Sequence, residues 1–379
     1  MYLRGKGRLR TMKNVISYVN DILEMGIKER ASDIHIKYDN DESEIKFRVD
    51  GILTESLKLE EKVSKTVFSK NIIEIISRLK ILSEMNVAEK RKPQDGSFSF
   101  GFNGENYDIR AAFMPTVNGE SIVLRILKSY LENTELETLG FSEKNRGILN
   151  RILSKKYGLI LVSGPTGSGK STTLMSIINI LNNGEKKIIS VEDPVENKIK
   201  GIVQVQVNED IGVTFPEILK NTLRNDPDII VISEIRDEIT AEIAVRAALT
   251  GHLVIATIHT NDAISTIIRL SDMGIPKYLI LDSLIGIIAQ RLVGGKCRNC
   301  SGKGCKNCIK GYNGRISINE ILAVSEKIKS ILKDESSVHE CKIKLKSLQY
   351  ENFTDFEEDI KEKLAKNMLF EKDVFEFIN

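Results

Sequence analysis

The sequence predicts an α/β fold in which a doubly wound domain follows a smaller α+β domain. From about residue 140, short apolar runs rich in β-branched residues alternate with segments whose apolar residues recur at helical spacing. Before that point, two helical patterns accompany several short segments of alternating polarity. Four cysteines near residue 300 predict a third, very small metal-binding module.

Composition and charge limit the classes of protein to be considered. Apolar residues make up 41% of the chain and charged residues 28%, and the net charge of +2 gives no indication of a nucleic-acid partner. We find no apolar run long enough to span a bilayer, and no apolar segment of a signal peptide follows the basic N-terminus. We therefore expect no transmembrane segment. Because clustered cysteines are typical of a metal site in a reducing compartment, we also expect a cytoplasmic protein.

The first third predicts a compact α+β domain over residues 12–128, preceded by a basic tail at 1–11 and followed by a charged connector at 129–139. Helices are expected over 12–28 and about 60–85, and short strands at 31–36, 45–51, 97–102, 106–113 and 121–127. Arg110 and Arg125 each lie on an otherwise apolar strand. Considered alone, both arginines are charges that face solvent or form structural ion pairs.

The second domain, residues 140–295, contains a phosphate-binding loop, Gly164-Pro165-Thr166-Gly167-Ser168-Gly169-Lys170-Ser171-Thr172, between an apolar strand and a helix. Glycines allow successive backbone N–H groups to turn toward an anion, and the helix N-terminus adds partial positive charge. Lys170 is expected to reach the β- and γ-phosphates, and the Ser171 hydroxyl to bind Mg²⁺. The alternative is a surface turn rich in glycine and serine, but the strand–loop–helix context favours a nucleoside triphosphate in a P-loop core.

Polar residues also follow three other predicted strands of this domain. Glu192, Glu234 and His259 come after the apolar runs 187–191, 229–232 and 253–258. Open α/β sheets bind ligands at the carboxyl ends of their strands, where an acid can hold the Mg²⁺ shell or orient the attacking water. The pattern does not decide between the two glutamates. The alternative for Glu234 is a structural ion pair with Arg236, and the alternative for His259 is a purely structural histidine. Elsewhere in this domain, helices are expected over 241–249 and 281–292.

The cysteine module, residues 296–316, contains two Cys-x-x-Cys pairs: Cys297, Cys300, Cys305 and Cys308. Each pair can bind one edge of a tetrahedral Zn²⁺, and glycines between the pairs allow a sharp reversal of the chain. Four thiolates close the coordination shell, so such a zinc is expected to be structural rather than catalytic. Free or redox-active thiols are the alternative. The remaining residues, 317–379, predict a charged helical region.

From about Ala31 to about Leu322 the chain resembles the secretion ATPases that drive type II secretion, type IV pilus assembly and DNA-uptake pseudopili. The phosphate loop says little about family, because many unrelated folds share it. Three runs carry the resemblance in the second domain: Val191–Glu196, similar to the Asp box; Leu223–Asp237, similar to the atypical Walker B motif; and Thr240–Ala263, which ends in the His box. Ser32–His35, Arg48–Gly51 and Arg91–Gly96 match the family's second N-terminal domain.

The resemblance implies a RecA-like ATPase core with a preceding PAS-like domain, bound ATP and Mg²⁺, and a ring-shaped homohexamer. It also implies that Arg110 and Arg125 contact the γ-phosphate when the first domain closes on the core, and that His259 senses the same phosphate. The implied partner is an inner-membrane platform protein, which would hold the chain at the cytoplasmic face of the membrane. No direct contact with nucleic acid is expected. The implied work is assembly of a type IV pilus, a type II pseudopilus or a competence pseudopilus.

Departures from the family pattern and two alternative functions complete the prediction. Ser233 replaces a usual glycine and Ile239 a usual glutamate, and we expect a short form that lacks the family's first N-terminal domain. A retraction or DNA-transfer motor of the same superfamily is one alternative, but retraction motors generally lack the cysteine module. A zinc-stabilised nucleic-acid-binding protein is the other, and the near-neutral charge and the lack of an aromatic, basic surface argue against it.

Overall fold

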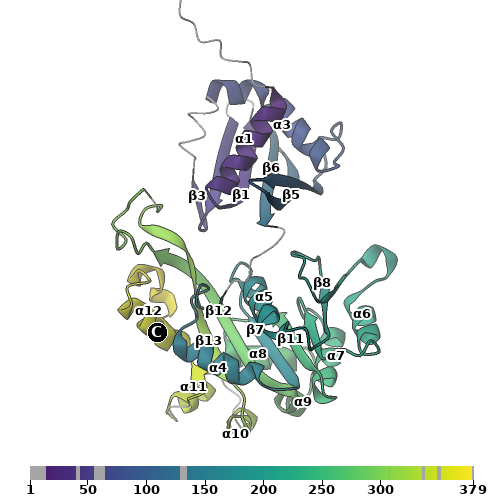
Figure 1. The fold of residues 1–379 in the computed structure, drawn as a ribbon, viewed down its shortest axis with the longest axis vertical. Helices are drawn as coiled ribbons and strands as arrows, with labels where there is room; N and C mark the ends of the chain where they lie inside the picture. The colour runs from purple at the N-terminus through teal and green to yellow at the C-terminus, as the bar shows by residue number, and fades with distance from the viewer. Residues whose placement is uncertain are drawn as a thin grey trace, which may run out of the picture. The chain divides into compact units, whose positions relative to one another are not determined.

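The computed structural model describes residues 14–39, 43–54, 65–128, 135–306, 308–334, 338–347 and 351–377. The chain divides into two compact units, Met1–Tyr130 and Leu131–Asn379 (Figure 1). The basic tail predicted at 1–11 and residues 129–134 of the predicted connector lie outside the described residues. Among the residues that are described, no helix has the length and apolar character needed to cross a membrane.

The first unit contains a six-stranded antiparallel sheet in the order β3-β2-β1-β6-β5-β4. Its strands are β1 (Ala31–Asp39), β2 (Ser43–Val49), β3 (Ile52–Thr54), β4 (Gln94–Phe102), β5 (Glu105–Thr116) and β6 (Gly119–Lys128). Its helices, α1 (Val15–Lys28) and α3 (Lys65–Leu82), pack against each other and on the sheet (Figure 1). Alternate strand residues such as Ile34, Ile36 and Leu124 are fully buried, so one face of the sheet forms the core of this unit.

The second unit is built on an eight-stranded mixed sheet in the order β14-β13-β12-β7-β11-β10-β8-β9. Its strands are β7 (Gly158–Ser163), β8 (Ile188–Glu192), β9 (Val203–Gln206), β10 (Ile229–Ile232), β11 (Leu253–Ile258), β12 (Leu284–Lys296), β13 (Tyr312–Ala323) and β14 (Phe353–Thr354). The six strands from β12 to β9 run parallel, and β13 and β14 are antiparallel to their neighbours.

Helices cover both faces of this second sheet, which explains its continuous apolar strands. The helices are α4 (Glu143–Leu153), α5 (Lys170–Leu181), α6 (Phe215–Thr222), α7 (Glu238–Leu249), α8 (Ala263–Asp272), α9 (Lys277–Ser283), α10 (Glu326–Asp334), α11 (Val338–Ser347) and α12 (Phe356–Ala365), with short 3₁₀ turns at Glu209–Ile211, Glu371–Asp373 and Phe375–Phe377. In β7, Leu161 belongs to the apolar cluster on one face and Ile160 to the cluster on the other. The observed architecture is therefore an α/β fold with the central strands buried on both sides.

The helix predicted over 281–292 is wrong. Helix α9 ends at Ser283, and residues 284–296 form the long strand β12 instead. Neighbouring residues Ile287 and Ile288 are both fully buried, but in the clusters on opposite faces of the sheet. A strand that is buried on both faces has a nearly continuous apolar sequence. Over this length, such a sequence cannot be distinguished from that of a buried helix. The prediction of a helical region from residue 317 is wrong at its start, because residues 317–323 belong to β13.

Candidate nucleotide site

The parallel strands of the second unit bring the predicted site residues to one edge of the sheet. The register pairs Ser163 at the end of β7 with Ile258 at the end of β11, and it pairs Ile232 of β10 with Val191 of β8. The residues that follow these strand ends therefore lie along the same edge. In the strand order, β11 is next to β7, β10 comes next and β8 lies furthest away. The His259 and Glu234 strands are thus closer to the phosphate loop than the Glu192 strand.

The phosphate loop connects the end of β7 to the start of α5. Gly164 has a φ of +151°, and a Cβ atom there would meet Ser168 Oγ at 2.4 Å and the backbone oxygen of Gln290 at 2.6 Å, so the position requires glycine. Gly169 is the N-cap of α5, and no side chain caps this helix. The N–H groups of its first turn, which no intrahelical acceptor can satisfy, are therefore available to an anion.

Two side chains of the first turn of α5 have the properties expected of ligands for a phosphate and its cation. Lys170 Nζ donates to the backbone oxygens of Gly164, at 2.8 Å, and Pro165, at 3.2 Å, so the ammonium lies over the loop. Burial lowers the pKa of Lys170, and the charge of Glu234 opposes this shift. Ser171 is exposed at the start of the helix. The loop thus presents N–H groups, the Lys170 ammonium and the accessible hydroxyl of Ser171.

Glu234 and His259 are in direct contact at the same edge. His259 Nε2 lies 3.0 Å from Glu234 Oε1, and Arg236 Nε donates to Glu234 Oε2 at 2.9 Å. Burial lowers the pKa of His259 and the charge of Lys170 lowers it further, although Glu234 opposes both. The ion pair with Arg236 that was the structural alternative for Glu234 is therefore present, and it coexists with the contact to His259.

Glu192 has a different environment. Its Oε1 accepts hydrogen bonds from Ser190 Oγ at 2.7 Å and from Gln204 Nε2 at 2.9 Å, so it is held by its own strand and by β9. Neither of these two hydrogen bonds involves the phosphate loop or His259. The structure therefore brings Glu234 and His259 together with Lys170 and leaves Glu192 on β8, the next strand beyond that of Glu234.

The serine at position 233 needs no special backbone geometry. Ser233 is not among the residues with positive φ, so its backbone does not need glycine. Its N–H donates to the backbone oxygen of Val191 at 2.9 Å, and its carbonyl accepts a hydrogen bond from the Thr257 hydroxyl. With serine at this position, the segment before Glu234 is hydrogen-bonded to both neighbouring strands, β8 and β11.

Gln290 and Arg291 of β12 contact the site, although sequence reasoning assigned them no role. Gln290 is 1% exposed, donates to the backbone oxygen of Ser168 at 2.6 Å and accepts from Thr173 Oγ1 at 2.7 Å, which joins the phosphate loop to α5. Arg291 Nη2 donates to the backbone oxygen of Asn261 at 2.7 Å. Two consecutive polar residues inside an apolar run were the only signal in the sequence that could have identified them.

In the first unit, the two predicted arginines belong to a charged row across the sheet. The register places Arg110 opposite Arg125, Arg125 opposite Asp33, and Asp33 opposite Arg48. Asp33 is 7% exposed and its Oδ1 lies 3.0 Å from Arg125 Nε, whereas the side chain of Arg110 has no hydrogen bond or ion pair with any described residue. Like charges opposite each other destabilise a sheet unless a counter-charge is present. One carboxylate for three guanidinium groups leaves this row suited to an anion.

The four cysteines of the predicted metal module lie close together. Their Sγ atoms all fall within 4.8 Å of one another, with 3.9 Å between Cys297 and Cys305 and 3.7 Å between Cys300 and Cys308. A tetrahedral zinc with bonds of about 2.3 Å to sulfur separates its sulfur ligands by about 3.8 Å, so the donor set fits this ion. Desolvation raises the pKa of Cys300, but a hydrogen bond from the Gly304 N–H and the adjacent thiols outweigh it and lower this pKa to about 7.

Sequence comparison relates the chain to secretion proteins. The family described as type II/IV secretion system protein matches residues 9–375. The chain is 40% identical over 342 residues to type II secretion system protein E of Pectobacterium carotovorum subsp. carotovorum, which covers 84% of this chain and 67% of that protein. It is also 40% identical over 348 residues to type II secretion system ATPase E of Vibrio cholerae serotype O1, with coverage of 85% and 68%. The chain thus spans about two thirds of the length of these relatives.

Solved structures share the fold. The pilus retraction motor PilT with bound ADP is 28% identical, with a TM-score of 0.66 and coverage of 94% of this chain and 95% of that one. The ATPase DotB of Legionella pneumophila is 22% identical, with a TM-score of 0.73 and coverage of 97% of both chains. The likeness to DotB concerns the fold alone.

Proposed function

Because the chain belongs to the type II/IV secretion system protein family, we propose that it is an ATPase that powers a secretion or pilus machine. In its finer form, the proposed work is assembly of a type II secretion pseudopilus, a type IV pilus or a competence pseudopilus. The observation that carries the proposal is the meeting of Lys170, Glu234 and His259 at the uncapped N-terminus of α5. That arrangement supplies the charges that hydrolysis of a nucleoside triphosphate requires.

Each part of the proposed hydrolytic site has a physical reason. The phosphates would be held by the backbone of Gly164–Thr172 and by Lys170. Ser171 would hold Mg²⁺, which neutralises charge on the phosphate oxygens. Glu234, rather than Glu192, would orient and polarise the attacking water, because it alone of the two contacts His259. His259 would respond to the γ-phosphate through that contact.

The first unit would supply the remaining positive charge. Arg110 and Arg125 would reach the γ-phosphate when this unit closes on the core, and a guanidinium fork suits charge that develops on phosphate oxygens. Asp33 binds Arg125 through Nε, and within the described part of the chain both Nη atoms of this arginine are left for an anion. The lack of any ion-pair partner for Arg110 among the described residues supports the same role.

The architecture proposed around this site follows the sequence prediction. A PAS-like domain at 12–128 and a connector at 129–139 would precede a RecA-like P-loop core at 140–295. The Cys₄ module at 296–316, holding structural Zn²⁺, and the C-terminal region at 317–379 would complete the chain, with β13 continuing to Ala323. The working form would be a homohexamer at the cytoplasmic face of the membrane, bound there to a platform protein.

A retraction motor is the second candidate, and the likeness to PilT favours it. The two candidates differ in the cysteine module, which is typical of the assembly motors that this sequence resembles. The geometry of the four thiols supports bound zinc and therefore the assembly motor.

Substitution of Lys170 tests the proposed function. In the full chain with MgATP, Lys170→Ala should lower the rate of phosphate release by at least about 100-fold, because it removes a preorganised charge from the transferring phosphoryl group. Lys156→Ala is the matched control, since Lys156 is an exposed lysine that precedes β7 by two residues and lies outside the proposed site. Equal turnover in the wild type and in Lys170→Ala would refute the assignment.

A further inference from the structure

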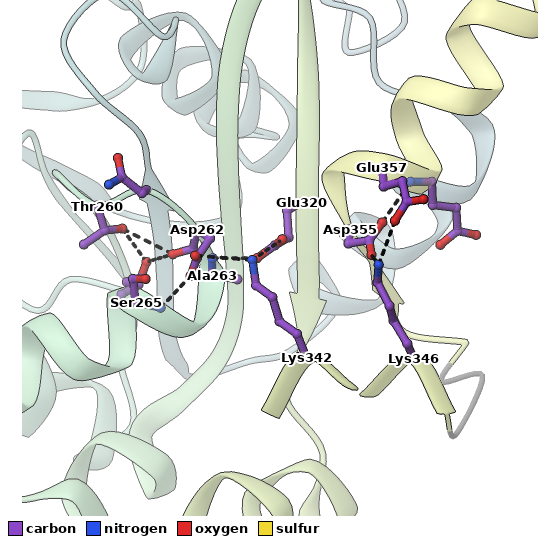
Figure 2. A network of polar contacts seen from close by, with 12 residues as sticks. Thr260, Asp262, Ala263, Ser265, Glu320, Lys342, Lys346, Asp355 and Glu357 are labelled. Carbon is purple, nitrogen blue, oxygen red and sulfur yellow. Dashed lines mark hydrogen bonds and ion pairs between the residues drawn. The ribbon is translucent and has the colours of Figure 1, made fainter. Parts of the chain in front are cut away.

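The C-terminal region, for which the sequence indicated no role, contacts the loop that follows β11. Lys342 on α11 points between two carboxylates, with its Nζ 3.0 Å from Glu320 Oε2 and 3.2 Å from Asp262 Oδ2 (Figure 2). Asp262 is the last residue of the His-box loop, residues 259–262, which begins at His259. Lys342, 80 positions beyond Asp262 in the sequence, therefore touches this loop directly.

Both carboxylates that Lys342 contacts fix the start of α8. Asp262 is the N-cap of α8 and accepts a hydrogen bond from the Ser265 N–H at 2.7 Å. Glu320 on β13 is 1% exposed and accepts from the Ala263 N–H at 2.8 Å. Since α8 begins where the His-box loop ends, these two acids determine where the loop is held, and Lys342 joins them (Figure 2).

Lys342 places a positive charge between the two acids that fix the start of α8. Asp262 and Glu320 supply two negative charges, while Lys342 and Arg291 supply two positive ones. Burial lowers the pKa of Lys342, but the two carboxylates outweigh burial and raise this pKa above its ordinary value. Among the described residues, Lys342 is the only cation within ion-pair distance of Glu320. Its loss would leave a fully buried carboxylate without a counter-charge.

The His-box loop is therefore held from two elements. Arg291 of β12 binds the Asn261 backbone, and Lys342 of α11 binds the Asp262 side chain. Helix α11 is itself fixed, because Cys341 and Leu345 are buried in the same apolar cluster as Ile267 of α8. Motion of the loop relative to α11 would separate Lys342 from Asp262, a partly exposed ion pair whose side chains are 25% and 17% exposed.

We propose that Lys342 is a positioning residue for ATP hydrolysis, which holds the His-box loop so that His259 keeps its contact with Glu234. The inference rests on the proposed function and extends it, because it gives the C-terminal region a part in the ATPase site. Lys342 touches no substrate; it acts through Asp262 and Glu320 on the position of His259. A displacement of about 1 Å in a reacting group can reduce catalysis by up to about 100-fold, so a residue that fixes a loop can have a large kinetic effect.

The same helix provides a matched control. Lys346 lies one helical turn after Lys342 and also contacts two carboxylates, Asp355 at 2.6 Å and Glu357 at 2.9 Å (Figure 2). Those acids belong to the start of α12 and its N-cap, and neither lies in the His-box loop. The two lysines therefore share a helix and a type of ion pair, but only Lys342 contacts the loop.

The test compares kcat, KM for ATP and thermal stability of the full chain in three variants. Lys342→Met should lower kcat by about 10- to 100-fold with a much smaller change in KM, because the nucleotide-binding loop is untouched. Lys346→Met should keep the wild-type kcat even where its melting temperature falls. Lys342→Arg keeps the cation and should recover most of the lost kcat.

A double variant separates positioning from the cost of an unpaired buried charge. Glu320→Gln combined with Lys342→Met removes both charges, keeps an acceptor for the Ala263 N–H and should restore folding if the single variant unfolds. Its kcat should stay low, because the tether to Asp262 is still missing. A wild-type kcat in the double variant, or equal losses in Lys342→Met and Lys346→Met, would overturn the inference. Absence of ATP turnover in the wild type would instead refute the proposed function.

Discussion

Replacement of Glu234 by glutamine should remove most ATP hydrolysis and leave the fold and nucleotide binding intact. Glutamine has the same shape, and its side-chain oxygen can still accept the hydrogen bond from Arg236 that Glu234 Oε2 accepts at 2.9 Å. The variant loses the negative charge beside His259, which opposes the lowering of the Lys170 pKa by burial, and one of the two acceptor oxygens becomes an NH₂ group. The phosphate loop itself is unchanged, so ATP should bind as in the wild type.

The size of the effect follows from the role. A group that takes or orients the proton of an attacking nucleophile contributes about 10²- to 10⁴-fold to the rate. At about 1.4 kcal/mol per factor of ten, this range corresponds to roughly 3–5 kcal/mol of activation free energy. Glu192→Gln is the matched comparison, because Glu192 Oε1 accepts from Ser190 and Gln204 and has no contact with His259. We expect this variant to lose less than about tenfold in kcat.

Steady-state phosphate release and equilibrium binding of a fluorescent ATP analogue measure the two quantities separately. The expected result is a large loss of kcat in Glu234→Gln with unchanged binding, and a small loss in Glu192→Gln. A larger loss in Glu192→Gln would show that Glu192 activates the water and that contact with His259 is a poor guide to the catalytic acid. Loss of binding in Glu234→Gln would show a structural role instead.

Two further predictions concern parts of the second unit away from the phosphate loop. The purified chain should contain about one zinc per chain, measured by mass spectrometry of the metal. Cys300→Ser should lose this zinc, and Cys341→Ser, outside the cluster, should keep it. A folded wild type without zinc would contradict the prediction. Asp359→Ala should lower the free energy of unfolding by about 3–5 kcal/mol, because it leaves Lys363 buried without its ion-pair partner; a thermal or urea unfolding curve that shifts by less than about 1 kcal/mol would contradict it.

The sequence was sufficient to predict features that are local in the chain. The phosphate loop, the strands before Glu234 and His259, and the pairs of cysteines are each defined by residue types at short, fixed spacing. A glycine that must adopt positive φ, or a run of β-branched residues, imposes its conformation without distant partners. These segments therefore appear in the structure where the pattern placed them.

Strand β12 shows where local patterns fail. Its residues 284–289 are apolar and pack into the clusters on both faces of the sheet, so neither a period of two nor a helical period distinguishes the structure. The outcome depends on pairing with β7 and β13, and β13 begins only after the last of the four clustered cysteines. Secondary structure there is a consequence of the tertiary fold, which no window of the sequence contains.

The polar contacts around the site have the same origin. Gln290 bonds to Ser168, Arg291 to Asn261 and Lys342 to Asp262, and each contact joins residues at least 30 positions apart. Such a residue has no signature beyond a polar side chain in an apolar segment, because the partner is set by packing. Sequence reasoning could therefore find the groups that are expected to touch phosphate, and it could not find the groups that hold them in place.

Strand β12 carries two of these supporting groups and leads directly into the metal module. Gln290 contacts the phosphate loop on one side of the strand, Arg291 contacts the His-box loop on the other, and the strand ends directly before Cys297 of the metal module. Successive residues of a strand point to opposite faces, so two adjacent side chains can hold both loops at once. Strand β13, which returns from the module, contributes Glu320, which accepts from the N–H of Ala263 directly after the His-box loop. The phosphate loop and the His-box loop both depend on this pair of strands. A metal that fixes the turn between β12 and β13 would therefore stabilise both loops.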